Sequence, residues 1–300
     1  MKWHGVLPAI TTPFRPDLSV DVEALARHVD LLVRSGCTGV VALGSLGEGA
    51  TLSFDEKLLV LAACREALGG RAPLVAGVAA LSTAEAVSLA VAAGRAGCEG
   101  LMVLPPYVYR GDVRETLAHF RAVIEATPLS CMLYNNPIAY GTDVLPEELV
   151  LLCASLPNLH AVKESSADVR RITSIRARLG GRLAVLVGVD DLVVEGVRSG
   201  ATGWVAGLVN ALPEESVRLF DLASSGRESE ALALYDWFLP LLRLDTVPKF
   251  VQLIKLVQAQ VGLGAETVRP PRLPLAGEER ERALALIRES LVSRPKGGAR

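Results

Sequence analysis

A short unit that decides the fold occurs three times: Gly36-Cys37-Thr38-Gly39 before Val40-Val41-Ala42-Leu43, Gly97-Cys98-Glu99-Gly100 before Leu101-Met102-Val103-Leu104, and Gly200-Ala201-Thr202-Gly203 before Trp204-Val205-Ala206. In each copy a glycine ends a helical segment and a run of apolar residues starts a short strand. The apolar runs are continuous rather than alternating, as expected of parallel strands that helices cover on both faces. The unit therefore predicts an α/β fold.

Along the whole chain, including the three copies of this unit, eight apolar segments have the length and composition of strands. They lie at residues 6–10, 39–43, 74–78, 100–104, 130–134, 159–163, 183–187 and 203–206. A helical segment follows each of them except the first, which is followed by a longer loop. Capping residues three positions before a glutamate mark helix starts at Ser53, Ser82 and Asp112. Eight strands that alternate with helices predict a (β/α)8 TIM barrel, and a doubly wound parallel sheet is the alternative.

The strand signal stops after Gly226. Three additional C-terminal helices are predicted, over residues 228–244, 246–261 and 278–291, followed by a frayed tail at 295–298. We therefore expect a barrel with the catalytic site over residues 1–223, and a helical region over residues 224–300 that packs on the barrel.

The composition argues against several classes of protein. The 300 residues include 31 basic and 33 acidic side chains, a net charge of −2, and no basic run is present, so nucleic acid is not expected as a partner. No stretch approaches the ~18 apolar residues of a membrane span. The N-terminus also lacks the apolar segment of a signal peptide, and we expect a cytoplasmic protein.

Cysteine and histidine spacing gives no sign of a metal or a cofactor. The five cysteines form no CxxC pair, and the four histidines stand far apart. An odd number of cysteines leaves one unpaired in any disulfide scheme, which favours a reducing compartment. The glycine motifs that bind nucleotides and dinucleotides are absent, so no cofactor is expected.

Lys163 ends the sixth predicted strand, at the barrel face where catalytic residues of this architecture lie. A lysine there could simply pair with a carboxylate such as Glu164. The functional alternative is a nucleophile that forms a Schiff base and must be uncharged to attack a carbonyl. With an ordinary pKa of ~10.4, only about one lysine in a thousand is uncharged at pH 7, and burial in an apolar barrel would increase that fraction.

Two further polar features follow neighbouring strands. Tyr134 ends the fifth strand, and its phenol could transfer a proton beside Lys163, although it could equally be a packing residue. The loop Gly44-Ser45-Leu46-Gly47-Glu48 follows the second strand. Its backbone amides and the Ser45 hydroxyl suit a carboxylate, although such a loop is also an ordinary tight turn.

Together these residues give the chain a clear resemblance to the dihydrodipicolinate synthase / N-acetylneuraminate lyase family of Schiff-base barrels. The resemblance covers roughly residues 5–290. It is carried by 5–14, the loop 44–48, Tyr134-Asn135-Asn136-Pro137, Lys163-Glu164-Ser165-Ser166 and Gly188-Val189-Asp190-Asp191.

The resemblance implies a role for each of these residues. Lys163 would form the imine with a 2-oxo acid, Tyr134 would transfer the proton, and Ser45 with the N–H of Leu46 would hold the substrate carboxylate. The family is commonly tetrameric, so a homotetramer is implied. Gly44, Gly188, Val205 and Tyr140 are further candidates for lining the substrate pocket.

The chain departs from the synthase pattern at three positions. Leu46 stands where the family has a hydroxyl, usually threonine. Val108 stands where a tyrosine crosses to a neighbouring subunit, with Tyr109 next along the chain. Ala139 replaces an arginine that would clamp a second carboxylate. Because charge-assisted bonds to an arginine contribute roughly 1.5 to 3 kcal/mol each, these departures argue against synthase activity.

The stretches 44–48, 134–141, 204–210 and 244–249 look like those of the branch that deaminates 1-pyrroline-4-hydroxy-2-carboxylate to 2,5-dioxopentanoate and ammonia in hydroxyproline breakdown. This activity is the first expectation from the sequence. The alternatives are a pyruvate-dependent aldolase or synthase of the same family, and a 2-oxo acid binding protein without catalysis. Of the remaining conspicuous residues, Asp190 and Asp191 are expected to cap the next helix, and Trp204 and the cysteines to pack in the core.

Overall fold

The computed structural model describes residues 1–295 and contains one sheet of eight parallel strands, so the predicted (β/α)8 TIM barrel with additional C-terminal helices is confirmed. Residues 296–298, part of the predicted tail, lie outside the described residues. The strands are β1 (Gly5–Pro8), β2 (Val40–Ala42), β3 (Leu74–Val78), β4 (Gly100–Val103), β5 (Ser130–Asn135), β6 (Leu159–Glu164), β7 (Ala184–Val187) and β8 (Gly203–Ala206). All eight overlap predicted segments, and the largest difference is at β1, which ends two residues earlier than predicted.

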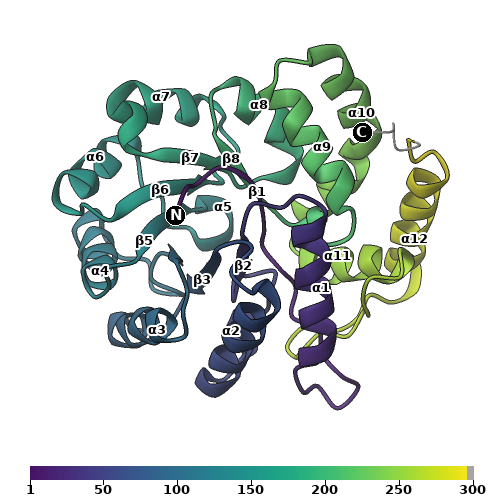
Figure 1. The fold of residues 1–300 in the computed structure, drawn as a ribbon, viewed down its shortest axis with the longest axis horizontal. Helices are drawn as coiled ribbons and strands as arrows, with labels where there is room; N and C mark the ends of the chain where they lie inside the picture. Colours follow the sequence, from purple (N-terminus) through teal and green to yellow (C-terminus); the bar gives the residue numbers. More distant parts are fainter. Residues whose placement is uncertain (296–300) are drawn as a thin grey trace.

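The barrel closes between β1 and β2. The ladder runs β1-β8-β7-β6-β5-β4-β3-β2, and a single parallel bridge between Ala9 and Val41 joins its two ends. Ile10 N–H donates to the Val41 carbonyl at 2.9 Å, and Thr38 N–H donates to the Val6 carbonyl at 2.9 Å. Figure 1 shows the strands in the centre of the molecule, surrounded by helices. All strands therefore present their carboxyl ends at one face, where loops can meet.

The helices of the barrel are α1 (Val22–Arg34), α2 (Phe54–Leu68), α3 (Thr83–Arg95), α4 (Val113–Glu125), α5 (Pro137–Tyr140), α6 (Pro146–Ser155), α7 (Arg170–Leu179), α8 (Val193–Arg198) and α9 (Pro213–Ser224). The predicted caps are confirmed: the side chains of Ser53, Ser82 and Asp112 each accept a hydrogen bond from the backbone three residues on. The short helix α5, which the sequence did not suggest, lies between β5 and α6 at the carboxyl face.

The C-terminal helices are α10 (Glu228–Leu242), α11 (Phe250–Gln260) and α12 (Gly277–Val292), and the 3-10 turn η5 (Arg243–Asp245) follows α10. The expectation that the second of these helices begins at Thr246 is wrong by four residues. Pro248 disfavours helical backbone at the residue before it, so the helix starts only after this proline. The predicted boundary at residue 223 stays a prediction.

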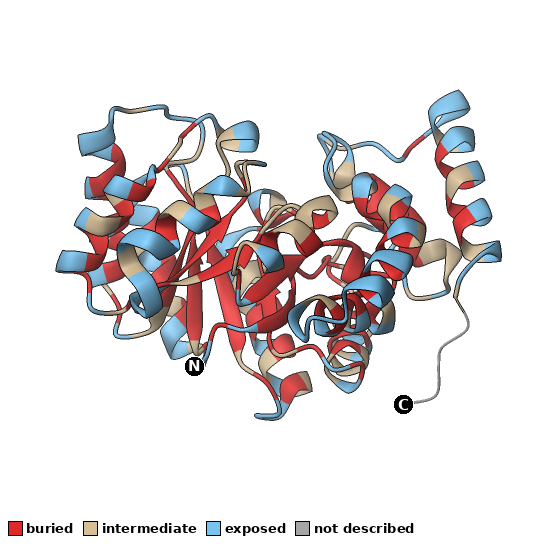
Figure 2. Cartoon of the chain, turned by 90° about the horizontal axis from the view of Figure 1, so that it is seen from above, coloured by how far each residue is buried: buried red, intermediate tan, exposed pale blue. Residues whose placement is uncertain are grey.

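The core has two layers. Inside the barrel a small cluster of side chains from the strands includes Leu7, Val41, Met132, Tyr134 and Val205. A larger cluster lies between the strands and the helices. In Figure 2 the central strands are buried and the helices expose only their outward faces. Among the described residues, no helix is long and apolar enough to cross a membrane.

The five cysteines are buried and form no disulfide in the described part of the chain. Burial raises the pKa of the Cys37 and Cys131 thiols to about 12, so these side chains are uncharged at neutral pH. Trp204 is fully buried as well. These residues pack in the core, as predicted.

Candidate active site

Lys163 and Tyr134 lie side by side at the carboxyl ends of β6 and β5, where the parallel register pairs the two residues directly. Lys163 Nζ lies 4.2 Å from the centroid of the Tyr134 ring. Both side chains are buried, with 7% and 6% of their surfaces exposed. The strand ends therefore bring together the two residues predicted to be catalytic.

The surroundings of Lys163 favour its uncharged form. Burial lowers the pKa of the amine to about 8, against the opposing effect of the Asp245 and Asp190 carboxylates. At a pKa of about 8, roughly one molecule in ten carries a neutral amine at pH 7, compared with about one in a thousand for a solvated lysine. No carboxylate of the described residues lies within 4.0 Å of Lys163 Nζ. The amine therefore has no fixed counterion among the described residues.

The Tyr134 hydroxyl accepts a hydrogen bond of 2.9 Å from Asn136 Nδ2. Burial raises the pKa of this phenol to about 12, and the bond from Asn136 partly opposes that effect. Asn136 also begins α5, because its side-chain oxygen accepts from the Ala139 amide at 3.0 Å. One amide side chain therefore positions both the phenol and the short helix beside it.

Tyr140, at the end of α5, connects Tyr134 to the loop after β2. Its hydroxyl is hydrogen-bonded to Ser45 Oγ, and its ring meets the Tyr134 ring edge-on at 5.7 Å. Burial raises the pKa of Tyr140 above its usual range. Three predicted site residues, Tyr134 on β5, Tyr140 on α5 and Ser45 in the loop after β2, thus form one continuous group.

The loop after β2 is shaped by backbone contacts. A Cβ on Gly49 would lie 2.2 Å from the Leu43 carbonyl oxygen, so only glycine fits there. Gly44 and Leu46 are buried, and the Leu46 amide donates no hydrogen bond within the described part of the chain. This N–H is available to a ligand, as the carboxylate prediction requires, and its role stays a prediction.

Gly188 lies directly against Lys163, whereas Val205 belongs to the apolar interior of the barrel. A Cβ on Gly188 would lie 2.6 Å from Lys163 Cε, so the absence of a side chain there makes room for the lysine. Val205 is 1% exposed and packs inside the barrel with Leu186 and Tyr134. Both stay predicted pocket residues.

Asp190 does not cap a helix, and that expectation is wrong. Its carboxylate accepts hydrogen bonds from Trp204 Nε1 at 2.9 Å, from the Leu208 amide at 2.8 Å and from the Gly207 amide at 3.1 Å. Neither η3 (Asp190–Leu192) nor α8 has a side-chain cap. Three N–H groups on and just after β8 bind the Asp190 carboxylate, so this side chain is not free to cap a helix. It connects the loop after β7 to the loop after β8 instead.

A second buried lysine, Lys255 of α11, lies behind the loop after β2. Its Nζ forms an ion pair of 2.6 Å with Glu48 and donates to the carbonyls of Thr12 and Thr267 at 2.9 and 2.7 Å. Burial lowers the pKa of this amine, whereas Glu48 raises it. The pair ties the loop that carries Ser45 to the C-terminal helices.

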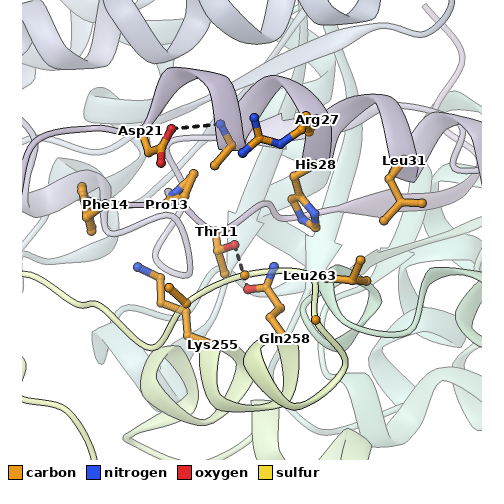
Figure 3. A pocket seen from close by; sticks show the side chains of 14 residues that line it. Thr11, Pro13, Phe14, Asp21, Arg27, His28, Leu31, Lys255, Gln258 and Leu263 are labelled. Atoms are coloured by element: carbon orange, nitrogen blue, oxygen red, sulfur yellow. Dashed lines mark hydrogen bonds between the residues drawn. The ribbon is translucent and has the colours of Figure 1, made fainter. Parts of the chain in front are cut away.

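A cavity of about 440 Å³ lies between α1 and α11, and Figure 3 shows Thr11, His28, Lys255 and Gln258 around it. None of the predicted site residues lines this cavity. The Lys163–Tyr134 pair at the ends of β6 and β5, rather than this cavity, is therefore the candidate site. Among residues 1–295 no cluster of three or more histidine, cysteine or acidic side chains could hold a metal ion.

Asp245 is the residue of the site that the sequence interpretation missed. It lies on η5, after the barrel, and its charge raises the pKa of Lys163, while Asp190 in turn raises the pKa of Asp245. Its only sequence signal is its place in the stretch 244–249, since no strand precedes it. The positions of strand ends do not predict Asp245, because it lies on the turn between α10 and α11 and packs against Gly207, just after β8.

A TIM barrel with a buried lysine beside a tyrosine at its carboxyl face is an arrangement typical of Schiff-base lyases. Residues 2–290 match the dihydrodipicolinate synthetase family. The chain belongs to this family.

Individual relatives match over nearly their whole length. The chain is 31% identical over 290 residues to the 4-hydroxy-tetrahydrodipicolinate synthase of Pelobacter propionicus, covering 95% of this chain and 98% of the relative. It is 36% identical over 281 residues to synthase 1 of Streptomyces coelicolor, covering 94% and 91%. A solved dihydrodipicolinate synthase of Acinetobacter baumannii, in complex with pyruvate, superimposes with a TM-score of 0.91 at 28% identity, covering 96% of this chain and 99% of that one.

Proposed function

We propose that the protein is a lyase that forms an imine between Lys163 and a small 2-oxo acid of the pyruvate type. The observation that carries this proposal is the buried, unpaired amine of Lys163, with its pKa lowered to about 8, directly beside the Tyr134 phenol. The names of the relatives and the pyruvate in the A. baumannii structure support the same substrate class.

The proposed reaction begins when the neutral Nζ attacks the C2 ketone and gives a carbinolamine. Loss of the hydroxyl as water leaves an iminium, which withdraws electrons from C3. Proton transfer at C3, assigned to Tyr134, then gives an enamine. The enamine carbon can attack an aldehyde, and the reverse sequence cleaves the same carbon–carbon bond.

Substrate orientation is assigned to the loop after β2. The Leu46 amide and the Ser45 hydroxyl, which is fixed by Tyr140, would hold the carboxylate of the 2-oxo acid. A carboxylate in this cradle would direct the ketone toward Lys163.

Reduction of the imine tests the proposal. The protein is incubated with pyruvate and sodium borohydride, and its peptides are analysed by mass spectrometry. We expect a reduced pyruvate adduct on the peptide that contains Lys163. The Lys163→Arg variant should lose the adduct, whereas Lys57→Arg, which replaces a half-buried lysine on α2, should retain it. A wild-type protein without the Lys163 adduct would contradict the proposal.

Deamination of 1-pyrroline-4-hydroxy-2-carboxylate is the second candidate, and the departures from the synthase pattern favour it. Ala139 on α5 cannot clamp a second carboxylate, and the buried Leu46 supplies no hydroxyl. Arg110 weakens this argument, because a Cβ on Gly141 would lie 2.4 Å from its guanidinium carbon, which places a cation against Gly141, two residues after Ala139.

The two candidates differ in their products. With the cyclic imine as substrate, deamination releases ammonia and 2,5-dioxopentanoate, both measurable directly. Pyruvate released from a 4-hydroxy-2-oxo acid, without ammonia from the cyclic imine, would exclude the deaminase and support the aldolase.

A further inference from the structure

The cavity of about 440 Å³ between α1 and α11 is separate from the candidate active site. Its volume lies within the range of small-molecule pockets, ~300–1,000 Å³. Apolar side chains line it from both sides, including Phe14 before α1, Leu31 on α1 and Leu263 after α11 (Figure 3). Pockets of this kind orient a small molecule through the few polar groups on their walls.

The ring of His28, on α1, lines the cavity and contains a buried nitrogen without a partner. Asn210 fixes which nitrogen carries the hydrogen. Its Nδ2 donates to the Ala9 and Gly207 carbonyls, both at 2.8 Å, so its Oδ1 is the atom that lies 2.8 Å from His28 Nε2. Nε2–H is therefore the donor to Asn210, and Nδ1 has a lone pair.

Nothing among the described residues donates to His28 Nδ1, and only 7% of the residue is exposed. Burial lowers the pKa of this ring, against the effect of the bond to Asn210, so the ring is uncharged at pH 7. Figure 3 shows it extending from α1 toward Gln258 and Leu263, on the other side of the cavity. A buried acceptor without a donor is uncommon, and here it indicates a ligand with an O–H or N–H group.

Gln258, on α11, supplies a group of the opposite type. Its Oε1 accepts a hydrogen bond of 2.9 Å from Thr11 Oγ1, so its Nε2 is the end of the amide that can donate. This NH2 group donates no hydrogen bond to any residue that the structure describes. Gln258 is 3% exposed and lines the same cavity. The two helices thus provide one acceptor and one donor.

Arg27 supplies the charge. Of the charged side chains that line the cavity, it alone has no ion-pair partner within residues 1–295. Lys255 is paired with Glu48 at 2.6 Å, and two backbone carbonyls accept its remaining hydrogen bonds. Asp21 lies 4.0 Å from Arg15. Arg27 is exposed, so it places one positive charge at the rim of the cavity. A single guanidinium suits a ligand with a single carboxylate.

We propose that the cavity between α1 and α11 is a binding site for a small hydroxy acid with one carboxylate. The carboxylate accepts from Arg27 and from Gln258 Nε2, and the hydroxyl donates to His28 Nδ1. These are the three polar groups of the cavity wall to which the described fold gives no partner. A phosphate ester, with a charge of about −2, matches a single cation less well.

The same geometry disfavours the 2-oxo acids assigned to the candidate active site. A ketone oxygen can only accept hydrogen bonds, so a 2-oxo acid would bring its lone pairs against that of His28 Nδ1. The cavity is thus a second site with the opposite preference. Lys255 lines it and also holds Glu48, so a bound acid lies next to the ion pair that fixes the loop carrying Ser45.

Three acids that differ only at C2 test the proposal: lactate, pyruvate and propionate. The protein is labelled with 15N-histidine, which gives few signals because the chain has four histidines. The His28 signals are assigned by their loss in His28→Gln. We expect lactate to shift the Nδ1 signal of His28 and to saturate the site. Pyruvate and propionate should bind there at least roughly fivefold more weakly, the effect of one hydrogen bond. Equal binding of all three acids, or no saturable shift with lactate, would overturn the inference.

Two arginine variants test the place of the carboxylate without a change in the core. Arg27→Gln should weaken lactate binding about tenfold, the effect of one charge-assisted hydrogen bond. Arg34→Gln is the control, because Arg34 is an exposed residue of the same helix that does not line the cavity. It should bind lactate as the wild type does. Equal affinities in the two variants would contradict the proposed carboxylate position.

Lactate bound at the candidate active site is distinguished by Lys163→Arg. This variant should keep the lactate-induced shift of His28, because Lys163 does not line the cavity. A shift that disappears in Lys163→Arg would show that lactate acts from the barrel mouth, and would overturn the inference. The result does not depend on imine formation, so the proposed function and the cavity site can fail separately.

Discussion

Lys163 and Lys255 are both buried lysines at the carboxyl face of the barrel, and each amine lies over an aromatic ring, at 4.2 Å from Tyr134 and 4.5 Å from Phe14. Their polar partners differ. Lys255 has a carboxylate at 2.6 Å and two backbone carbonyls, whereas Lys163 has no carboxylate within 4.0 Å among the described residues. Burial alone therefore does not identify a reactive lysine. A buried lysine whose donors are all satisfied supports the fold, and one that is left unpaired is available for chemistry.

The largest effect is expected from removing the unpaired amine. Lys163→Met should reduce turnover by about four orders of magnitude, because no other group can form the imine. Its thermal unfolding temperature should stay the same or rise, since an uncompensated buried amine is replaced by an apolar side chain. Steady-state kinetics and calorimetry measure the two effects. Substantial residual turnover would remove Lys163 from the mechanism.

Removing the paired amine should instead affect stability. Lys255→Met removes the nearest cation of the buried Glu48 carboxylate and leaves only Arg272, at 3.8 Å, so we expect a loss of up to about 3–5 kcal/mol. Urea denaturation measures the loss. In a double-mutant cycle, Glu48→Gln combined with Lys255→Met should cost clearly less than the sum of the single changes. Additive effects would show that the two groups act independently.

The pH dependence of activity should follow the Lys163 amine. Below pH 8, where the amine becomes protonated, the rate of imine formation with pyruvate should fall about tenfold per pH unit. A rate that is independent of pH between 6 and 8 would contradict the lowered pKa.

The free energy of unfolding should also depend on pH through the lowered pKa of Lys163. The folded pKa of Lys163 is about 8, and that of an unfolded lysine is ~10.4, so between these pH values the unfolded chain binds more protons. The contribution of this group to stability therefore increases as the pH rises through that window. Lys163→Met should show a flatter pH dependence of unfolding there than the wild type.

The smallest effect is expected at the edge of the site. Tyr140→Phe removes the hydrogen bond to Ser45 but keeps the ring contact with Tyr134. The loss of one hydrogen bond, about 1 kcal/mol, should raise KM for pyruvate roughly fivefold and leave adduct formation at saturating pyruvate nearly unchanged. A large fall in kcat would instead place Tyr140 in proton transfer.

The barrel and the Lys163–Tyr134 pair could be predicted because their signals are local. Each strand is a continuous apolar run, and the parallel arrangement places the ends of neighbouring strands together. Asp190 was misassigned because an aspartate after a strand resembles a helix cap, and its donors on Trp204 and Leu208 are brought to it only by the closed barrel. Asp245 was missed because its position depends on how η5 packs against Gly207.

The ion pair between Glu48 and Lys255 also has a consequence for folding while the chain is being synthesised. The loop that carries Ser45 is synthesised well before α11, which supplies its cation. Until α11 docks, the Glu48 carboxylate lacks Lys255, and burying its charge alone is unfavourable. A nascent chain that ends before α11 should therefore keep this loop solvated, so that the barrel acquires its final form only after α11 has been synthesised.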